Sequence, residues 1–348
     1  MQKVKLKEVC TLINGRAYKQ EELLDSGKYP VLRVGNFFSD KDYYYSDLEL
    51  EEDKYCDSGD LLFAWSASFG PKIWNGGKVI YHYHIWKMVL EDAVNKEYLY
   101  YYLYYLSERI KAEGHGGIMI HTTKAEMEER ELSLPDMSKQ CEIAKVLNQL
   151  SAIIEKRQTE IKELDNLIKA RFVEMFFDKG YPVLGWNDVF NTTTGKLDSN
   201  AMVEDGKYPF FTCAKEVYRI DKYAFDQEAL LLAGNNAAGK YDVKYYKGKF
   251  NAYQRTYVLG LKQEWSYRLF QYQLEDKLVY LQQQSLGGLT KYLTMKILGG
   301  LSFIIPPMEQ QIEFESFVKQ VDKSKVAVQK SLDETQKLFD SLMQEYFG

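Results

Sequence analysis

The feature that most constrains the fold of this chain is a long-range internal repeat. Segments of the first half recur in the second half in the same order, at an offset that drifts only slightly. The matched pairs are GKYP at 27–30 and 206–209, Gly15-Arg16 and Gly195-Lys196, the apolar runs 61–64 and 230–233, Val89-Leu90 and Val258-Leu259, and LPDM at 134–137 with IPPM at 305–308. The repeat predicts two related globular units, each followed by a polar, periodic tail.

Each tail has the pattern of a long helix, because apolar residues recur at steps of three and four over about five heptads. The seam residues are Ile143, Leu147, Leu150, Ile154, Ile161, Leu164, Ile168 and Met175 in the first tail, and Phe314, Val318, Val321, Val328, Leu332, Phe339, Leu342 and Tyr346 in the second. Polar residues interrupt the seams at Arg157, Arg171, Lys325 and Thr335. A seam this narrow favours an antiparallel helix pair with a globular unit at each end. The alternative is that each helix packs only on its own unit.

Before each tail, short apolar runs alternate with clusters of Gly, Asn and Tyr, which favours mixed α/β (α+β) units with irregular sheets. We expect a helix at 95–112 and its counterpart at 265–284. The predicted fold is two mixed globular domains separated by two long antiparallel coiled-coil helices, with an internal pseudo-twofold repeat. The predicted segments are a first globular domain at 1–137, a first long helix at 138–179, a second globular domain at 180–307 and a second long helix at 308–348.

The net charge of −5 argues against a generic binder of acidic polymers, but the charge is uneven. Residues 1–135 hold 17 Lys and Arg against 22 Asp and Glu, whereas residues 180–306 hold 15 against 12. The basic bias of the second unit permits contact with nucleic acid. The four cysteines form no C-x-x-C pair, and we find neither a signal-peptide core nor an apolar run of membrane-helix length. We therefore expect a cytoplasmic protein without disulfides or membrane contact.

One stretch of the second unit nearly completes a nucleotide-binding P-loop. Residues 234–240 have the sequence GNNAAGK, which matches G-x-x-x-x-G-K, but Tyr241 stands where a Mg²⁺-ligating Ser or Thr is needed. The Tyr- and Val-rich segment that follows is typical of a strand, whereas a P-loop opens a helix. In the first unit Trp65 stands at the place of Gly234. We therefore expect a recurring surface loop and no nucleotide site.

Other candidate chemistry is weak. His82 and His84 alternate on a strand, but no third metal ligand has suitable spacing, and the second copy aligns Tyr253 with His84. Lysines and tyrosines interleave from 240 to 249, a pattern that suits phosphate contact and a solvated hairpin equally. We expect no metal site, no bound cofactor and no catalytic centre in this chain.

Two related units, two matched long helices and no catalytic centre resemble the specificity subunit of a type I restriction-modification system, over essentially the whole chain. The most telling segments are GKYP at 206–209, LLLA at 230–233 with Gly239-Lys240, NAYQR at 251–255, and the two Pro-to-helix junctions LPDMSKQ at 134–140 and IPPMEQQ at 305–311. The first unit departs from the pattern at Trp65 and at 84–86.

The resemblance implies a non-catalytic subunit whose two target-recognition domains each read one half of a bipartite site in double-stranded DNA. It implies two methyltransferase subunits and motor-endonuclease subunits as partners, which would carry S-adenosylmethionine, ATP and Mg. A helix over 138–176 would extend about 60 Å, which bounds the half-site spacing to roughly 17 base pairs. Two alternatives stay open: the specificity partner of a fused nuclease-methylase, and a coiled-coil adaptor whose end domains bind proteins instead of DNA.

Polar residues in equivalent loops of the two units are the candidates for DNA contact. Asn and Arg can bond adenine and guanine edges bidentately, whereas Lys mostly holds phosphate. The candidates are Arg16, Arg33, Asn36, Ser66, Ser68 and Lys72 in the first unit, and Lys196, Asn235, Asn236, Lys240, Lys244 and Arg255 in the second.

Overall fold

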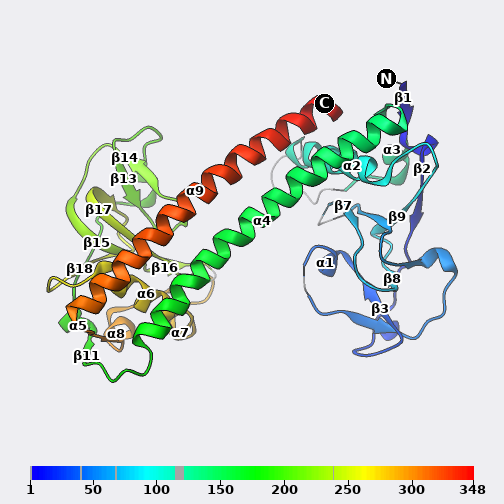
Figure 1. Ribbon diagram of the computed structural model, residues 1–348. Coiled ribbons are helices and arrows are strands. Elements are labelled where there is room, and N and C mark those ends of the chain that lie inside the picture. The colour runs from blue at the N-terminus through cyan, green and yellow to red at the C-terminus, as the bar shows by residue number, and fades with distance from the viewer. Residues whose placement is uncertain (1, 40, 67–68, 114–120, 238) are drawn as a thin grey trace. The chain divides into compact units, whose positions relative to one another are not determined.

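The computed structural model of the protein describes residues 2–39, 41–66, 69–113, 121–237 and 239–348 (Figure 1). The chain divides into two compact units: unit 1 comprises residues 1–158 and 330–348, and unit 2 comprises residues 159–329. The boundary falls inside both long helices, so each unit holds one globular part and one half of each helix. The four-part division into functional domains stays a prediction.

The globular part of unit 1 contains β1 (Gln2–Lys5), β2 (Cys10–Asn14), β3 (Tyr29–Leu32), α1 (Val34–Phe37), β4 (Tyr44–Ser46), β5 (Tyr55–Cys56), β6 (Leu61–Ala64), β7 (Gly70–Ile73), β8 (Val79–Tyr81), β9 (Ile85–Leu90), α2 (Lys96–Glu113), α3 (Lys124–Glu128) and β10 (Glu131–Leu134). The strands form two four-stranded sheets, β2-β9-β6-β7 and β4-β3-β8-β5, and the pair β1-β10. Helix α2, which confirms the first predicted helix, packs on the first sheet, where Leu99 and Leu103 share a core with Phe63.

The globular part of unit 2 contains β11 (Val183–Gly185), α5 (Trp186–Val189), β12 (Phe190–Thr194), β13 (Tyr208–Phe211), β14 (Tyr218–Ile220), β15 (Phe225–Ala233), β16 (Asn235–Asn236), β17 (Val243–Ala252), β18 (Thr256–Leu261), α6 (Tyr267–Asp276), α7 (Leu278–Gln284), β19 (Lys291–Tyr292), α8 (Met295–Leu298) and β20 (Ser302–Ile304). One six-stranded sheet runs β12-β18-β15-β17-β13-β14, beside the pairs β11-β20 and β16-β19. The predicted helix at 265–284 is in fact two, because the Lys277 amide bonds the Leu274 carbonyl three residues back and ends α6.

The two units share one strand frame, which confirms the predicted repeat and the mixed fold. Leu32 of β3 lies in parallel register with Tyr81 of β8, as Phe211 of β13 does with Ala252 of β17. Strand β15 occupies the place of β5 and β6, and β17 that of β7 and β8. The six-stranded sheet of unit 2 therefore corresponds to the two four-stranded sheets of unit 1 joined end to end, with β5 and β6 continuous as β15 and with β7 and β8 continuous as β17.

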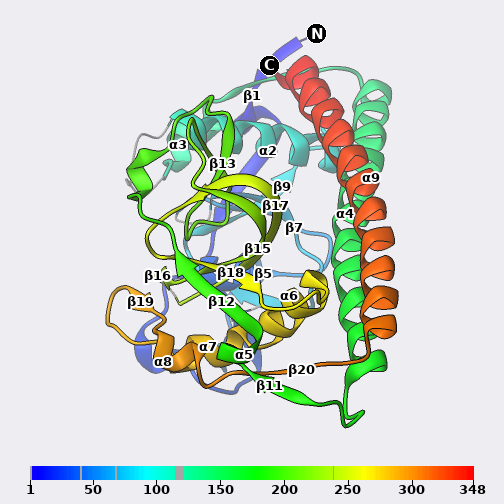
Figure 2. The same ribbon diagram turned by 90° about the vertical axis from the view of Figure 1, so that its left-hand side faces the viewer.

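The long helices α4 (Met137–Phe176) and α9 (Met308–Phe347) pack against each other within each unit (Figures 1 and 2). In unit 1, Leu147 near the start of α4 shares a core with Phe339 near the end of α9. In unit 2, Ile168 near the end of α4 shares a core with Phe314 near the start of α9, and Leu269 of α6 joins them. The pairing is antiparallel, as predicted, and each helix half also packs on its own globular part. All predicted seam residues are buried or half-buried.

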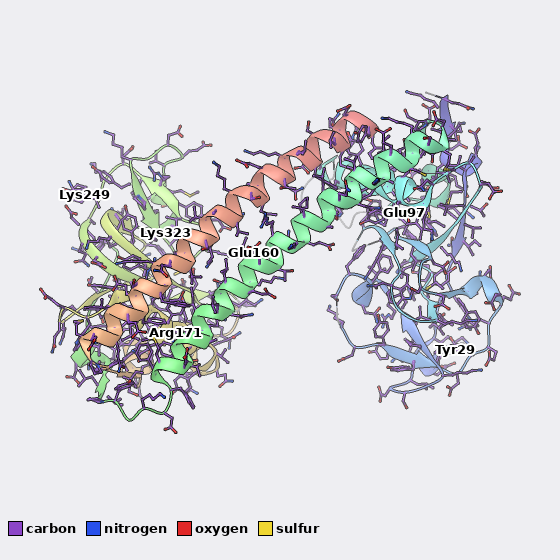
Figure 3. The ribbon with its side chains drawn as sticks, in the orientation of Figure 1. Tyr29, Glu97, Glu160, Arg171, Lys249 and Lys323 are labelled. Atoms are coloured by element: carbon purple, nitrogen blue, oxygen red, sulfur yellow. The ribbon has the colours of Figure 1, made fainter. Side chains whose placement is uncertain are left out.

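Two of the polar residues that interrupt the seams are paired in unit 2. Lys325 forms an ion pair with Asp165 across the helix pair. Arg171, labelled in Figure 3, forms ion pairs with Glu174 on its own helix and with Glu313 of α9. These side chains are partly exposed, so each pair contributes about 0–1 kcal/mol. The two pairs that join the helices, Lys325 with Asp165 and Arg171 with Glu313, fit the register in which α4 and α9 pack in unit 2.

A buried glutamine explains why the two Pro-to-helix junctions match. The Gln140 amide donates to the carbonyls of Pro135 at 2.9 Å and Ala93 at 3.0 Å, and accepts from the Asn95 amide at 2.8 Å. Asn95 in turn caps α2 by accepting from the Tyr98 amide at 2.9 Å. One side chain therefore joins the start of α4 to the start of α2.

Unit 2 repeats this junction with fewer bonds. The Gln311 amide donates to the Pro306 carbonyl at 2.8 Å and accepts from the Ser266 amide at 3.1 Å. Ser266 is the N-cap of α6. Both glutamines are about 1% exposed, so their polar atoms must be satisfied within the protein.

Candidate nucleic-acid interface

Unit 2 has a cavity of about 620 Å³ where β12 and β15 end and β18 begins. We call it the unit-2 cavity. Its lining is mostly polar and aromatic, and consists of Thr194, Gly234, Asn235, Gln254, Arg255, Tyr257, Thr290, Tyr292 and Leu293.

Backbone bonds tie three distant segments together around this cavity. The Gly234 amide donates to the Arg255 carbonyl at 2.8 Å, and the Leu293 amide donates to the Gly234 carbonyl at 2.8 Å. Asn235 is paired with Tyr292 in the short β16–β19 ladder, and Figure 2 shows these two strands side by side. The strand frame therefore sets the backbone around the cavity and leaves its side chains free to vary.

The chemistry of the unit-2 cavity suits recognition by hydrogen bonds. Arg255 is exposed and Asn235 is half-buried, so a guanidinium and an amide face solvent at the same place. Burial raises the pKa of Tyr257, against a smaller opposing effect of the Arg255 charge. The phenol therefore stays protonated near neutral pH, and it donates to the Leu293 carbonyl at 3.1 Å.

The corresponding place in unit 1 is filled by aromatic rings. The Trp65 amide donates to the His84 carbonyl at 3.1 Å, as Gly234 does to Arg255 in unit 2. The indole of Trp65 stacks on Trp86 with ring centroids 5.8 Å apart, and its N–H donates to the Tyr83 carbonyl at 2.8 Å. We call Trp65, His82, Tyr83, His84 and Trp86 the unit-1 aromatic cluster.

These matched bonds correct the sequence alignment. The Ile85 amide donates to the His82 carbonyl at 2.9 Å, and the Thr256 amide donates to the Tyr253 carbonyl at 2.8 Å. Tyr253 therefore corresponds to His82, and Arg255 corresponds to His84. The sequence alignment was two residues out here for two reasons. The loop after the first buried strand is three residues longer in unit 2 (234–241) than in unit 1 (65–69), and the stretch that follows it is one residue shorter in unit 2 (242–252) than in unit 1 (70–81).

Both histidines of the unit-1 aromatic cluster are kept neutral. Burial, followed by the nearby His84 and Arg33 charges, lowers the pKa of His82 to about 4. Burial also lowers the pKa of His84. Their rings lie 4.9 Å apart. At the position that corresponds to Arg255, unit 1 thus has an aromatic side chain, His84, which is uncharged near neutral pH.

The predicted DNA-contact residues of unit 2 fall into two groups. Asn235 and Arg255 line the unit-2 cavity, and Lys196 and Lys240 are exposed. Asn236 accepts from the Lys240 amide at 3.3 Å and so stiffens the loop between them.

The predicted residues of unit 1 are more tied into the fold. Arg16 holds Glu22 bidentately at 2.9 and 2.7 Å, which lowers the pKa of that carboxyl to about 2. Arg33 lies over the Tyr44 ring at 5.3 Å. Asn36 is 5% exposed and accepts from the Arg33 amide at 2.7 Å. Ser66 is buried, and Ser68 lies outside the described residues.

Lys72 and Lys244 are matched residues that bind backbone within their own units. Strand pairing sets Lys72 opposite Leu62 and Lys244 opposite Leu231, at corresponding positions of β6 and β15. The Lys72 ammonium donates to the Phe37 carbonyl at 2.7 Å. The Lys244 ammonium donates to the Ala214 carbonyl at 2.8 Å and forms an ion pair with Asp242. Each lysine thus fixes the segment that follows β3 or β13.

The stretch of Lys and Tyr at 240–249 belongs largely to β17. Lys247 forms an ion pair with Glu228 at 3.0 Å and Lys249 one with Asp226 at 4.0 Å, both across to β15. These pairs favour the solvated-hairpin interpretation over phosphate contact. The strand that follows the loop also confirms that 234–240 is no P-loop, since that motif would open a helix.

Seven lining residues of the unit-2 cavity escaped the sequence prediction: Thr194, Gly234, Gln254, Tyr257, Thr290, Tyr292 and Leu293. Gln254 precedes Arg255 in the NAYQR segment, so proximity to Arg255 was an available signal. Thr290 and Tyr292 come from a segment that only the β16–β19 pairing brings to the cavity. Among the described residues, no three His, Cys, Asp or Glu side chains gather as a metal site requires. None of the described helices combines the length and apolar character needed to cross a bilayer.

The fold defines a class of protein with two related globular units, built on one strand frame and different at their matched loops. Residues 1–165 and 180–335 match the family model of the type I restriction modification DNA specificity domain. The chain belongs to this family, which confirms the resemblance found in its sequence.

Two curated relatives are specificity subunits from Escherichia coli. The chain is 38% identical over 149 residues to the type I restriction enzyme EcoDI specificity subunit, a match that covers 41% of this chain and 32% of that protein. It is 21% identical over 169 residues to the EcoBI specificity subunit, over 48% of this chain and 36% of that protein. The chain thus spans about a third of the length of the curated relatives that it matches.

Two solved structures share the fold. The S subunit of the type I restriction-modification system from M. genitalium superposes with a TM-score of 0.64 at 16% identity, over 100% of this chain and 96% of that chain. A chain from a structure on complex assembly and conformational transition of the type I R-M system superposes with a TM-score of 0.53 at 15% identity, over 99% and 97%.

Proposed function

We propose that this chain is the DNA-recognition subunit of a type I restriction-modification complex, and that unit 1 and unit 2 each read one half of a bipartite, asymmetric DNA site. The observation that supports this proposal is the contrast at matched positions of one strand frame. Unit 2 has Arg255 at the position where unit 1 has His84, and Gly234 at the position where unit 1 has Trp65. An asymmetric site has two different half-sites, so reading it requires two copies of the strand frame that carry different side chains at their DNA-facing positions.

In unit 2 the reading group is the Arg255 guanidinium, which can bond guanine O6 and N7 bidentately, with the Asn235 amide beside it for adenine. Lys196 and Lys240 hold phosphates. In unit 1, Arg33 and the exposed edge of the aromatic cluster meet the other half-site. The net charge of +3 over residues 180–306 is consistent with a stronger phosphate contribution from unit 2.

The chain itself is non-catalytic in this proposal and works in the cytoplasm. Helices α4 and α9 set the spacing of the half-sites and recruit two methyltransferase subunits, and motor-endonuclease subunits complete the complex. These partners carry S-adenosylmethionine, ATP and Mg. Exposed apolar side chains on the helices, such as Ile153, Leu167 and Val326, supply surface for the partners.

The experiment that tests the proposal is long-read methylation mapping of the host genome with and without this gene. Loss of N6-methyladenine at one bipartite motif on deletion is the expected result. Unchanged methylation, together with no methyltransferase co-purifying with the chain, would leave the protein-binding adaptor as the better account. Co-purification of a single polypeptide with nuclease and methylase activity would identify the fused partner instead.

The assignment to unit 2 is tested by Arg255→Ala in the same strain. We expect methylation to become independent of one base pair in one half of the motif, because the bidentate contact is lost. Lys323→Ala is the matched control, since it removes one positive charge from unit 2 on α9, where Figure 3 labels it. Equal motifs in the two variants would rule out Arg255 as a reading residue.

A further inference from the structure

Leu289 has the highest exposed fraction, 96%, among the large apolar side chains that stand exposed in the described residues. Most exposed apolar side chains of unit 2 keep one face against the protein. Leu289 keeps almost none, so it adds nothing to the core of unit 2 and its apolar surface faces water in the free protein.

The segment that carries Leu289 is a closed hairpin, which we call the 286–292 hairpin. Leu286 and Tyr292 exchange two backbone bonds, of 3.1 and 2.9 Å. Gly287 has a φ of +102°, and a Cβ there would lie 2.2 Å from the Thr290 carbonyl oxygen, so only glycine fits this turn. The β16–β19 pairing ties the base of the hairpin to Asn235 and Asn236, which follow β15. Leu289 is therefore held at the tip of an anchored turn.

The hairpin stands at the rim of the unit-2 cavity, because Thr290 and Tyr292 line that cavity beside Arg255 and Asn235. Leu289 thus adjoins a cation and an amide, and the exposed apolar side chains nearest to it along the hairpin, Leu286 and Tyr292, are only about half exposed, at 49% and 43%. The exposed apolar surface of the hairpin is small and lies beside a polar cavity, whereas a protein partner more often covers a broad apolar patch. DNA offers both parts of the match: polar base edges for the cavity and an apolar base stack for the tip.

We propose that Leu289 acts as a wedge that enters a base step in the half-site read by unit 2, partly unstacking it while Arg255 holds the neighbouring base edge. This inference rests on the proposed function. Apolar side chains that enter base steps from the minor groove bend the duplex and increase its contact with the protein. We expect the same partial unstacking for a wedge that enters from the major groove, where Arg255 would meet guanine. The sequence Gly287-Gly288-Leu289 recurs in the first half as Gly116-Gly117-Ile118, which lies outside the described residues.

The test uses the full chain with its co-purifying methyltransferase subunits and duplexes that carry 2-aminopurine at successive positions of the mapped half-site. Wild-type protein is expected to raise the fluorescence severalfold at one step. Leu289→Ala and Leu289→Asn should remove that rise and weaken binding about tenfold, whereas Leu289→Met should keep both. Val279→Ala is the matched control, because it removes another exposed apolar side chain, 66% exposed, from unit 2.

Three results would overturn the inference, and they are distinguishable. Fluorescence and affinity of Leu289→Asn equal to those of Val279→Ala would exclude a wedge while leaving DNA recognition intact. Loss of the methyltransferase from Leu289→Asn, with the fluorescence rise retained, would identify the hairpin as a protein contact. Failure of the wild-type complex to bind any duplex in a selection from random DNA would remove the proposed function itself.

Discussion

Unit 1 and unit 2 differ in their side chains at a place where the hydrogen bonds of their strand frames match. After the matched strands β6 and β15, unit 1 has Trp65, stacked on Trp86, and unit 2 has Gly234, which leaves a cavity of about 620 Å³. The backbone bonds that flank both residues are the same. The comparison teaches that the frame fixes where a reading surface lies, while the residues just beyond the strands decide whether it is a ring stack or an open cavity.

The two surfaces also differ in charge. The exposed Arg255 of unit 2 corresponds to His84 of unit 1, and burial lowers the pKa of that histidine. In unit 1, Arg16 is held by Glu22. Unit 2 is therefore equipped for charge-assisted bonds to base edges and phosphates, and unit 1 for contacts in which shape and stacking count for more.

The largest loss of stability is expected when Trp65 of unit 1 is replaced by glycine, the residue that unit 2 has at the equivalent position. Trp65→Gly removes a half-buried indole with its stack and its bond to Tyr83, which should destabilise unit 1 by about 2–4 kcal/mol. Hydrogen exchange resolved by peptide should speed up in β6 and β9 and stay unchanged in β15 and β18. Trp65→Phe keeps part of the packing, so its exchange rates in β6 and β9 should lie between those of the wild type and Trp65→Gly. Equal protection of unit 1 in all three proteins would contradict a structural role for the indole.

Replacing the buried glutamines should give the next largest loss of stability. The loss should differ between the units, because the two glutamines make different numbers of hydrogen bonds. Gln140→Ala leaves three backbone groups without their partner, and Gln311→Ala leaves two. At about 1 kcal/mol for each bond, unit 1 should lose about 3 kcal/mol and unit 2 about 2 kcal/mol. Urea unfolding followed by unit-specific proteolysis measures both. An equal or reversed order would mean that relaxation or water replaces the bonds to Ala93 and Pro135.

The helices could be predicted because their signal is a local spacing of apolar residues, and the repeat because similar segments recur in the same order along the sequence. Residues such as Leu147, Ile168, Phe314 and Phe339 repeat at helical spacing, and all four are buried where α4 and α9 pair. The alignment of the two units after the loops at 65–69 and 234–241 could not be predicted. Counting residues from the matched segments wrongly aligned Tyr253 with His84. Only the strand register, which depends on pairing between distant segments, shows that Tyr253 is equivalent to His82.

The candidate DNA-contact residues also divide into those that the sequence could predict and those that depend on the fold. Arg255 and Asn235 could be predicted from residue type and loop position, and both line the unit-2 cavity. Asn36 and Lys72 look equally suitable in the sequence, but the fold brings them to the Arg33 amide and the Phe37 carbonyl. A sequence shows which side chains can bond DNA, and the folded backbone decides which of them are already bonded.

A smaller effect is expected from pH and concerns unit 1 alone. The pKa of His82 is about 4 in the folded protein, mainly because of burial, against about 6.5 when unfolded. The unfolded state binds more protons between these values, so this stability is fully present above about pH 6.5 and is lost as pH falls towards 4. We expect a loss of about 1–2 kcal/mol in unit 1.

The matched variant for this prediction is His82→Tyr, which installs the residue that unit 2 has at Tyr253. Protection factors in β8 and β9, corrected for intrinsic exchange, should then lose most of their dependence on pH between 6.5 and 4. Peptides of β17 and β18 report on unit 2 under the same conditions. A pH dependence that survives His82→Tyr would assign it to other groups, with His84 the first to test.

The smallest effects concern the matched lysines, which the sequence assigned to DNA and the fold binds to carbonyls. Lys72→Met and Lys244→Met keep the aliphatic stem and remove the ammonium, so each unit should lose about 1 kcal/mol. Neither should change the slope of log affinity against log salt concentration, because an ammonium already bonded inside the fold releases few counterions from DNA.

Lys240→Met and Lys196→Met are the controls, since both side chains are exposed on unit 2. Each should lower the salt slope by about one if it holds a phosphate. A drop of that size in Lys72→Met or Lys244→Met would instead mean that the lysine leaves its carbonyl, of Phe37 or Ala214, when DNA binds. The segments after β3 and β13 would then be released on binding, and the shared frame would change shape as it reads its half-site.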